Sequence, residues 1–181
     1  MKNSRGDIWF VDASHLVYSA FLGCLWSRER IFIKSPSGRS WYNVLGAFNP
    51  IRCELITVKN EGYVNATTVI ELIRKLREKY RFLKITLVMD NARYQRCAAV
   101  MECARENDVQ LLFLPSYSPN LNLIERLWKF VKKNALNNKY YTDFISFKAG
   151  IDECLENIKT KYKSEVMSLM SLNFHIVHNA K

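Results

Sequence analysis

The chain has 181 residues, 49% of them hydrophobic and 24% charged, which is typical of a globular domain and excludes a disordered chain. Lys and Arg (27) outnumber Asp and Glu (17), and the net charge of +10 favours an acidic partner such as nucleic acid. No apolar run approaches the roughly eighteen residues of a membrane span, and no signal peptide follows Met1. We therefore expect a cytosolic protein that contacts no membrane. Five scattered cysteines without a C-x-x-C pair argue against a zinc or redox site.

The first third of the chain is predicted to be an antiparallel meander. Residues 7–11 form a compact apolar run that indicates a buried strand, and Asp12 stands at its exit. After a turn signal at residues 35–38, residues 41–48 and 53–58 are predicted to be further strands. An acid at the end of a strand is more often a turn residue than a catalyst, so position alone gives Asp12 no role.

The remaining chain alternates helices and strands. Asn65 is the predicted N-cap of a helix, and strands at 84–89 and 109–114 alternate with helices at 93–105, around Glu125, and at 142–162. Such alternation builds parallel strands through helical crossovers. The predicted fold is therefore α/β, with a mixed central sheet flanked by helices. Asp90 follows the strand at 84–89, where it or Asn91 could also cap the next helix.

The helix around Glu125 is strongly amphipathic. A loop with Pro115 and Pro119 precedes it. On a helical wheel one side is apolar, and the other carries a basic stripe of Arg126, Lys129, Lys132 and Lys133, which we predict to bind DNA. Glu125 lies at the edge of this stripe and has two interpretations. It could complete a capping box with Asn122. Alternatively, it could point into a cleft, with the basic stripe binding a polyanion that runs past Glu125.

Three acids are predicted to converge in this basic protein. Sites in parallel sheets gather at the carboxyl ends of strands, where Asp12 and Asp90 lie, and Glu125 opens a helix that could cross the same edge. Converging carboxylates repel one another unless a cation intervenes, and oxygen ligands favour Mg²⁺ or Mn²⁺. Two such ions could activate a water or a 3′-hydroxyl on one side of a phosphodiester and stabilise the leaving oxygen on the other.

Two segments carry a resemblance to a known family. These are FVDASH around Asp12, and DNAR at Asp90 followed after 34 intervening residues by Glu125 within PSYSPNLNLIERLW. They resemble the catalytic core of DDE transposases, and most nearly the bacterial insertion-sequence relatives of mariner, the insertion sequence 630 family. The resemblance implies a ribonuclease H-like fold and a metal-binding catalytic triad of Asp12, Asp90 and Glu125. It also implies cut-and-paste transposition with Mg²⁺ or Mn²⁺ by a homodimer on double-stranded DNA, with transposon ends as substrate and TA as target, in the bacterial cytosol.

The domain organisation follows from the same resemblance. We expect a catalytic domain over residues 1–165, a C-terminal tail over 166–181, and no N-terminal helix-turn-helix in this chain, so that end selection would need such a domain or a partner reading frame. A ribonuclease H-like nuclease or junction resolvase is an alternative with the same triad chemistry. A basic DNA-binding remnant without catalysis is another. His15 and Tyr117 could line the cleft, although surface or packing roles are commoner for such residues, and His175 and His178 are assigned no role.

Overall fold

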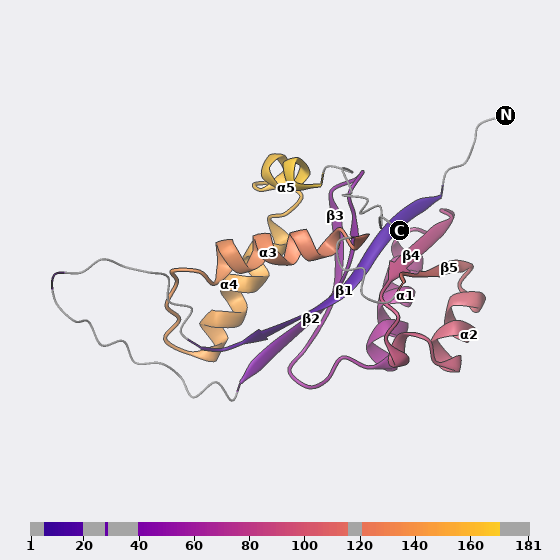
Figure 1. The fold of residues 1–181 in the computed structure, drawn as a ribbon, viewed down its shortest axis with the longest axis horizontal. Coiled ribbons are helices and arrows are strands. Elements are labelled where there is room, and N and C mark those ends of the chain that lie inside the picture. Colours follow the sequence, from indigo (N-terminus) through magenta and orange to yellow (C-terminus); the bar gives the residue numbers. More distant parts are fainter. Residues whose placement is uncertain (1–5, 20–27, 29–39, 116–120, 171–181) are drawn as a thin grey trace, which may run out of the picture.

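The described part of the chain is built around one mixed sheet. The computed structural model describes residues 6–19, 28, 40–115 and 121–170. These form a five-stranded sheet of order β3-β2-β1-β4-β5 (Figure 1). The strands are β1 (Asp7–Val17), β2 (Trp41–Asn49), β3 (Glu54–Asn60), β4 (Ile85–Met89) and β5 (Val109–Phe113).

The strand directions confirm the predicted mixed sheet. β1, β2 and β3 pair antiparallel, while β4 is parallel to β1 and β5 is parallel to β4. The predicted end of the first strand is wrong, because β1 continues to Val17. Its pairing with β2 extends to the contact of Val17 with Trp41, whereas its pairing with β4 stops at Val11. Asp12 therefore lies within β1, at the point where the parallel neighbour ends.

The helices are α1 (Ala66–Lys79), α2 (Ala98–Glu106), α3 (Ile124–Ala135), α4 (Phe144–Glu156) and α5 (Lys163–Leu169), with a short 3-10 turn η1 (Arg93–Gln95) before α2. Asn65 caps α1 as predicted, and its side chain accepts a hydrogen bond from the backbone N–H of Thr68.

Two predicted helices are wrong in extent. The helix expected at 93–105 is η1 followed by α2, because Cys97 is extended and serves as the N-cap of α2. Neither Asp90 nor Asn91 caps either element, since the N-caps are Ala92 and Cys97 and neither makes a side-chain capping bond. The helix expected at 142–162 ends at Glu156, with Asn157 as its C-cap, and α5 follows separately.

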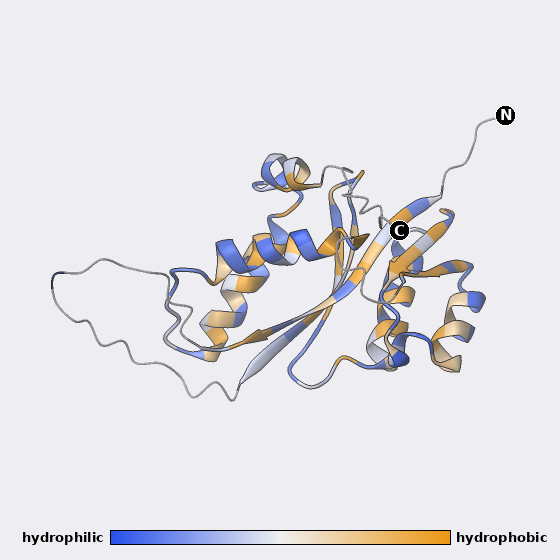
Figure 2. Cartoon of the chain, viewed as in Figure 1, coloured by the Kyte–Doolittle hydropathy of each residue, from blue (hydrophilic) through white to orange (hydrophobic). Residues whose placement is uncertain are grey.

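The helices cover the two faces of the sheet in separate groups (Figure 1). One core lies between the sheet and α1 and α2, and includes Trp9 and Val11. The other lies under α3, α4 and α5, and includes Leu16 and Phe147. Hydrophobic and hydrophilic residues alternate along α3 (Figure 2), whose inner side is buried and whose stripe lysines are exposed.

Two further findings bear on the predicted organisation. α5 crosses the expected boundary at residue 165, and its Val166 is fully buried in the second core. None of the helices in the described ranges has the length and apolar character that a membrane span requires.

Candidate active site

Asp12 lies on the face of β1 that α3 covers. Its partner across the β1–β2 ladder is Gly46, and β4 ends one residue earlier, at the pairing of Met89 with Val11. The side chain is largely buried, and burial is the main reason that its pKa is raised from 3.8 to about 7. The negative charges of Asp90 and Glu125 raise it further, while a hydrogen bond from the backbone N–H of Ala13 lowers it. Ionisation of a carboxyl group in these surroundings is energetically unfavourable unless a cation is bound nearby.

Asn122 ties the other two segments to β1. Its Nδ2 donates to the Val11 carbonyl oxygen at 3.1 Å and to Asp90 Oδ1 at 3.4 Å. Only 1% of Asn122 is exposed, so both bonds are shielded from water. One amide thus joins the end of the parallel pairing, the residue after β4 and the entry to α3. Its Oδ1 is buried and accepts no hydrogen bond from the described residues.

The capping-box interpretation of Asn122 and Glu125 is wrong. Leu123 is the N-cap of α3, and it makes no side-chain capping bond. Glu125 is the second residue of α3, and its pKa is raised by burial and by the charge of Asp90, while Lys129 one turn later lowers it. Asp12, Asp90 and Glu125 therefore come within electrostatic range of one another, as the sequence predicts.

A close contact between α3 and β2 sets the position of Glu125. A Cβ atom on Gly46 would lie 2.8 Å from Trp128 Cη2 and 3.2 Å from Ile124 Cδ1, so α3 can sit this close only over a glycine. Trp128 is buried beside Asp12, and its indole N–H lowers the pKa of that carboxyl, although the geometry falls short of a hydrogen bond. The missing side chain at Gly46 therefore lets the helix bring its acid to the strand.

A cavity of about 310 Å³ opens at these residues. It is lined by residues 12–15 of β1 together with Glu125, Trp128, Lys129 and Lys132 of α3. Half of the basic stripe thus faces the same space as two of the acids. Lys129 also lines a cavity of about 270 Å³ between α3 and α5, together with Arg126, Lys133 and Leu169. Arg126 donates to the Leu169 carbonyl oxygen at 3.0 Å, so it also holds α5 against α3.

The oxygen atoms of the three acids and of Asn122 are of the chemical type that binds a hard divalent cation. Three carboxylates that repel one another, and the Asn122 amide oxygen, which accepts no hydrogen bond from the described residues, are the kind of oxygen ligands that Mg²⁺ and Mn²⁺ take. Within the described ranges, no group of three His, Cys, Asp or Glu side chains is arranged to hold a metal ion. The acids are near one another without forming a closed set of ligands.

The structure places further residues in the site to which the sequence analysis gave no role there. Asn122 and Trp128 belong to the family-like segment, but only their neighbours in space give them roles. Tyr94 of η1 is a third, since burial and the charges of Asp12 and Asp90 raise its pKa. His15 lines the cavity beside the acids. Tyr117, His175 and His178 lie outside the described residues.

Comparison with known proteins places the chain in a family. The family model described as "DDE superfamily endonuclease" matches residues 7–148. A protein of Sinorhizobium fredii, "Uncharacterized protein y4pE/y4sA", is 40% identical over 38 residues, which are 21% of this chain and 28% of that protein.

Solved structures share the fold at low sequence identity. The Mos1 transposase paired-end complex with left transposon end has a TM-score of 0.63 and 17% identity, covering 93% of this chain and 56% of that one. The Mos1 mariner paired-end complex with Mn has a TM-score of 0.61 and 17% identity, covering 90% and 55%. The catalytic core domain of BIV integrase has a TM-score of 0.56 and 15% identity, covering 86% and 85%. The chain thus spans little more than half of the Mos1 chains in these two paired-end complexes.

Proposed function

Since the chain belongs to the DDE superfamily of endonucleases, we propose that it is the catalytic domain of a DNA transposase, which cuts phosphodiester bonds and joins 3′-OH ends to new DNA. The observation that carries the proposal is the approach of Asp12, Asp90 and Glu125 at one end of the β1–β4 pairing. Burial and the charges of neighbouring acids raise the pKa values of Asp12 and Glu125, which line one cavity of an otherwise basic protein, and perturbed carboxyls in a cavity favour a catalytic site.

Asp12, Asp90 and Glu125 would hold Mg²⁺, or Mn²⁺ in its place. When bound, such ions supply charge that activates the attacking oxygen and stabilises the leaving oxygen, and two ions do so on both sides of the phosphate. The Mos1 paired-end complexes crystallised with Mn and with Mg support this choice of cation. A bound cation would offset the repulsion among the three acids.

The remaining residues of the cavity would position the DNA. Lys129 and Lys132 line the same space as Asp12 and Glu125 and would hold the phosphate backbone there, without reading bases. Asn122 fixes the strand end, Asp90 and the helix entry relative to one another, and Trp128 limits the access of water to the Asp12 carboxyl.

The natural substrate would be transposon ends with TA as target, bound by a pair of protomers. The Mos1 transposase paired-end complex with left transposon end supports transposon ends as the substrate. Selection of the ends would come from a DNA-binding domain in the same polypeptide or in a partner, because the basic stripe provides affinity without sequence discrimination.

A nicking and strand-transfer assay tests the proposal. Purified protein is incubated with supercoiled plasmid and with a pre-cut end oligonucleotide, in Mg²⁺, Mn²⁺ or EDTA. We expect metal-dependent nicking and joining of the 3′-OH end. Asp12→Asn, Asp90→Asn and Glu125→Gln should each lower the rates of nicking and of joining by at least about 100-fold. Even the residues that only hydrogen-bond to metal ligands change metal affinity or activity by 10–100-fold when they are mutated.

The matched control is Glu71→Gln, which neutralises an exposed acid of α1 whose ion-pair partner is Lys75. It should keep full activity. Full nicking by Asp90→Asn would refute the assigned site, and nicking without any strand transfer would identify a nuclease or junction resolvase instead of a transposase.

A further inference from the structure

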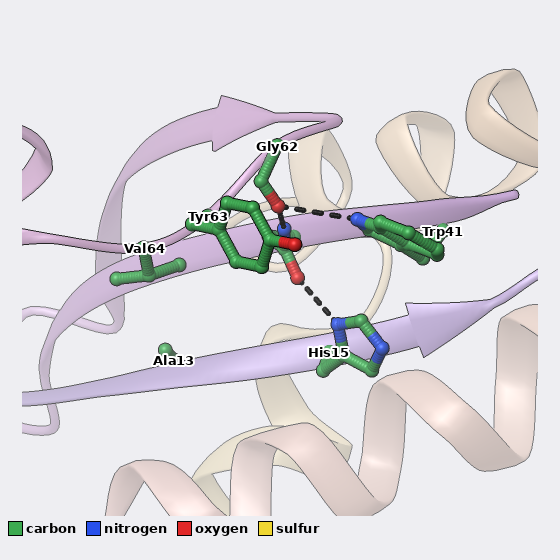
Figure 3. Close-up of a pocket in the computed structure, with 7 residues that line it drawn as sticks. Ala13, His15, Trp41, Gly62, Tyr63 and Val64 are labelled. Carbon is green, nitrogen blue, oxygen red and sulfur yellow. Dashed lines mark hydrogen bonds between the residues drawn. The ribbon is translucent and has the colours of Figure 1, made fainter.

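Ser14 lies two residues after Asp12 on β1 and faces α3. Side chains alternate between the two sides of a strand, so Asp12 and Ser14 point to the same side. Ala13 and His15 point to the other side, where they line a separate cavity of about 370 Å³ (Figure 3). The partner of Ser14 on β2 is Val44, which belongs to the core under α3. Ser14 therefore shares its side of the sheet with the acids.

The Ser14 hydroxyl is buried without a hydrogen-bond partner in the described part of the chain. Ser14 is 4% exposed, and its Oγ neither donates to nor accepts from any described residue. Burying a hydroxyl in this way is unfavourable, because the hydrogen bonds that it makes to water in the unfolded chain are lost. The chain thus gives up stability at a position roughly 7 Å along β1 from Asp12.

The side chains of α3 beside Ser14 are hydrogen-bond donors. Trp128, Lys129 and Lys132 line the same cavity as Ser14. An indole N–H and an ammonium group only donate, and Trp128 Nε1 is itself buried without an acceptor among the described residues. Ser14 could accept a bond from one of them, but its own proton would still lack an acceptor. A phosphate group carries negative charge and only accepts hydrogen bonds, so its chemistry fits this space.

We propose that the Ser14 hydroxyl donates a hydrogen bond to a phosphate oxygen of bound DNA, with Lys129 and Lys132 supplying the opposite charge. The inference rests on the proposed function for the position of the DNA at the acids. Successive nucleotides rise about 3.4 Å along a strand, so this phosphate lies about two nucleotides from the phosphodiester at Asp12. Ser14 is thus a substrate-binding residue that fixes the strand beside the reacting bond.

Affinity for a short DNA duplex in Mg²⁺, measured at several salt concentrations, tests the inference. The 3′ ends of the duplex carry no hydroxyl, so they cannot be joined. Ser14→Ala should weaken binding about tenfold, equivalent to 1.4 kcal/mol, at every salt concentration, because a neutral hydroxyl releases no counterion from DNA. Lys132→Gln should instead reduce the slope of log affinity against log salt by about 1. Ser14→Cys, whose thiol is a weak donor, should bind like Ser14→Ala.

Ser168→Ala is the matched control, the same substitution at an exposed serine of α5 that donates to the Glu165 carbonyl oxygen at 2.7 Å. It should bind DNA as wild type does. Without DNA or metal, Ser14→Ala should melt about 2–4 °C above wild type, because it removes a buried hydroxyl that has no partner. Equal affinities of wild type and Ser14→Ala would overturn the inference, whichever way the melting temperature moves, and so would wild-type affinity in Ser14→Cys.

Nicking in Mg²⁺ is measured on the same samples. Nicking by wild type, together with equal affinities of wild type and Ser14→Ala, removes the phosphate contact and leaves the proposed function standing. A tenfold loss of affinity in Ser14→Ala, without nicking by wild type, supports the contact and counts against the proposed function.

Discussion

Replacing Asp12 by Asn should stabilise the protein in the absence of metal. Burial and two neighbouring acids hold the pKa of this carboxyl at about 7 instead of 3.8. The folded state keeps the proton to a higher pH than the unfolded state, so this group's contribution to stability is intact below pH 3.8 and is lost as the pH rises through about 7. At 1.36 kcal/mol per pH unit the full loss is about 4 kcal/mol, which relaxation and water entry reduce to about 2 to 4 kcal/mol.

Thermal unfolding in EDTA at pH 4 and pH 8 measures this effect. At pH 8 Asp12→Asn should melt about 5 to 15 °C above wild type, since 1 kcal/mol shifts the melting temperature of a domain of this size by 2–4 °C. At pH 4 the two proteins should differ little. Saturating Mg²⁺ or Mn²⁺ should raise the melting temperature of wild type by mass action and leave Asp12→Asn almost unchanged.

The control is Asp143→Asn, the same substitution at an exposed carboxyl that caps α4 and whose pKa is lowered by hydrogen bonds at the cap. Asn caps as well as Asp, so this variant should gain no stability at pH 8 and should respond to metal as wild type does. The reasoning is refuted if wild type and Asp12→Asn melt together at pH 8 in EDTA, or if metal stabilises both equally.

Three further predictions concern the framework of the site. Gly46→Ala should lower the free energy of unfolding by about 1–3 kcal/mol, because its Cβ would meet the Trp128 ring at 2.8 Å; urea unfolding measures the loss, and Trp128→Phe in the same chain should recover part of it. Asn122→Ala should lower nicking by about 10–100-fold and stability by about 1–3 kcal/mol, since both of its buried bonds disappear; wild-type nicking by this variant would show that the amide does not position the acids. Changing the three stripe lysines to Gln should reduce the slope of log affinity for DNA against log salt by about 2 to 3. Titrations at several ionic strengths test this, and an unchanged slope would make the stripe an ordinary solvated surface.

The sequence predicted the sheet and the approach of the acids because both depend on local patterns. Short, mainly apolar segments mark β4 and β5, and the alternation with helices makes β4 and β5 parallel to β1. The true end of β1 was missed, because pairing with β2 carries the strand on to Val17 through polar residues that no apolar pattern marks.

The parts that could not be predicted depend on contacts between distant residues. Asn122 looked like a helix cap, but its amide bonds a carbonyl 111 residues earlier in the chain, and that contact competes with capping. The close packing of Trp128 against Gly46 likewise cannot be predicted from the sequence of either segment alone. The acids were found from their places in the sequence, whereas the side chains that position them were found only from the structure.

The most direct test of the central claim is to locate the metal. Crystals of the chain soaked in Mn²⁺ give an anomalous signal that marks the ion independently of any assay. The account predicts manganese bound by carboxylate oxygens of Asp12, Asp90 and Glu125 at about 2.1 Å. Manganese bound at other residues, or none near Asp12 at saturating concentration, would contradict it.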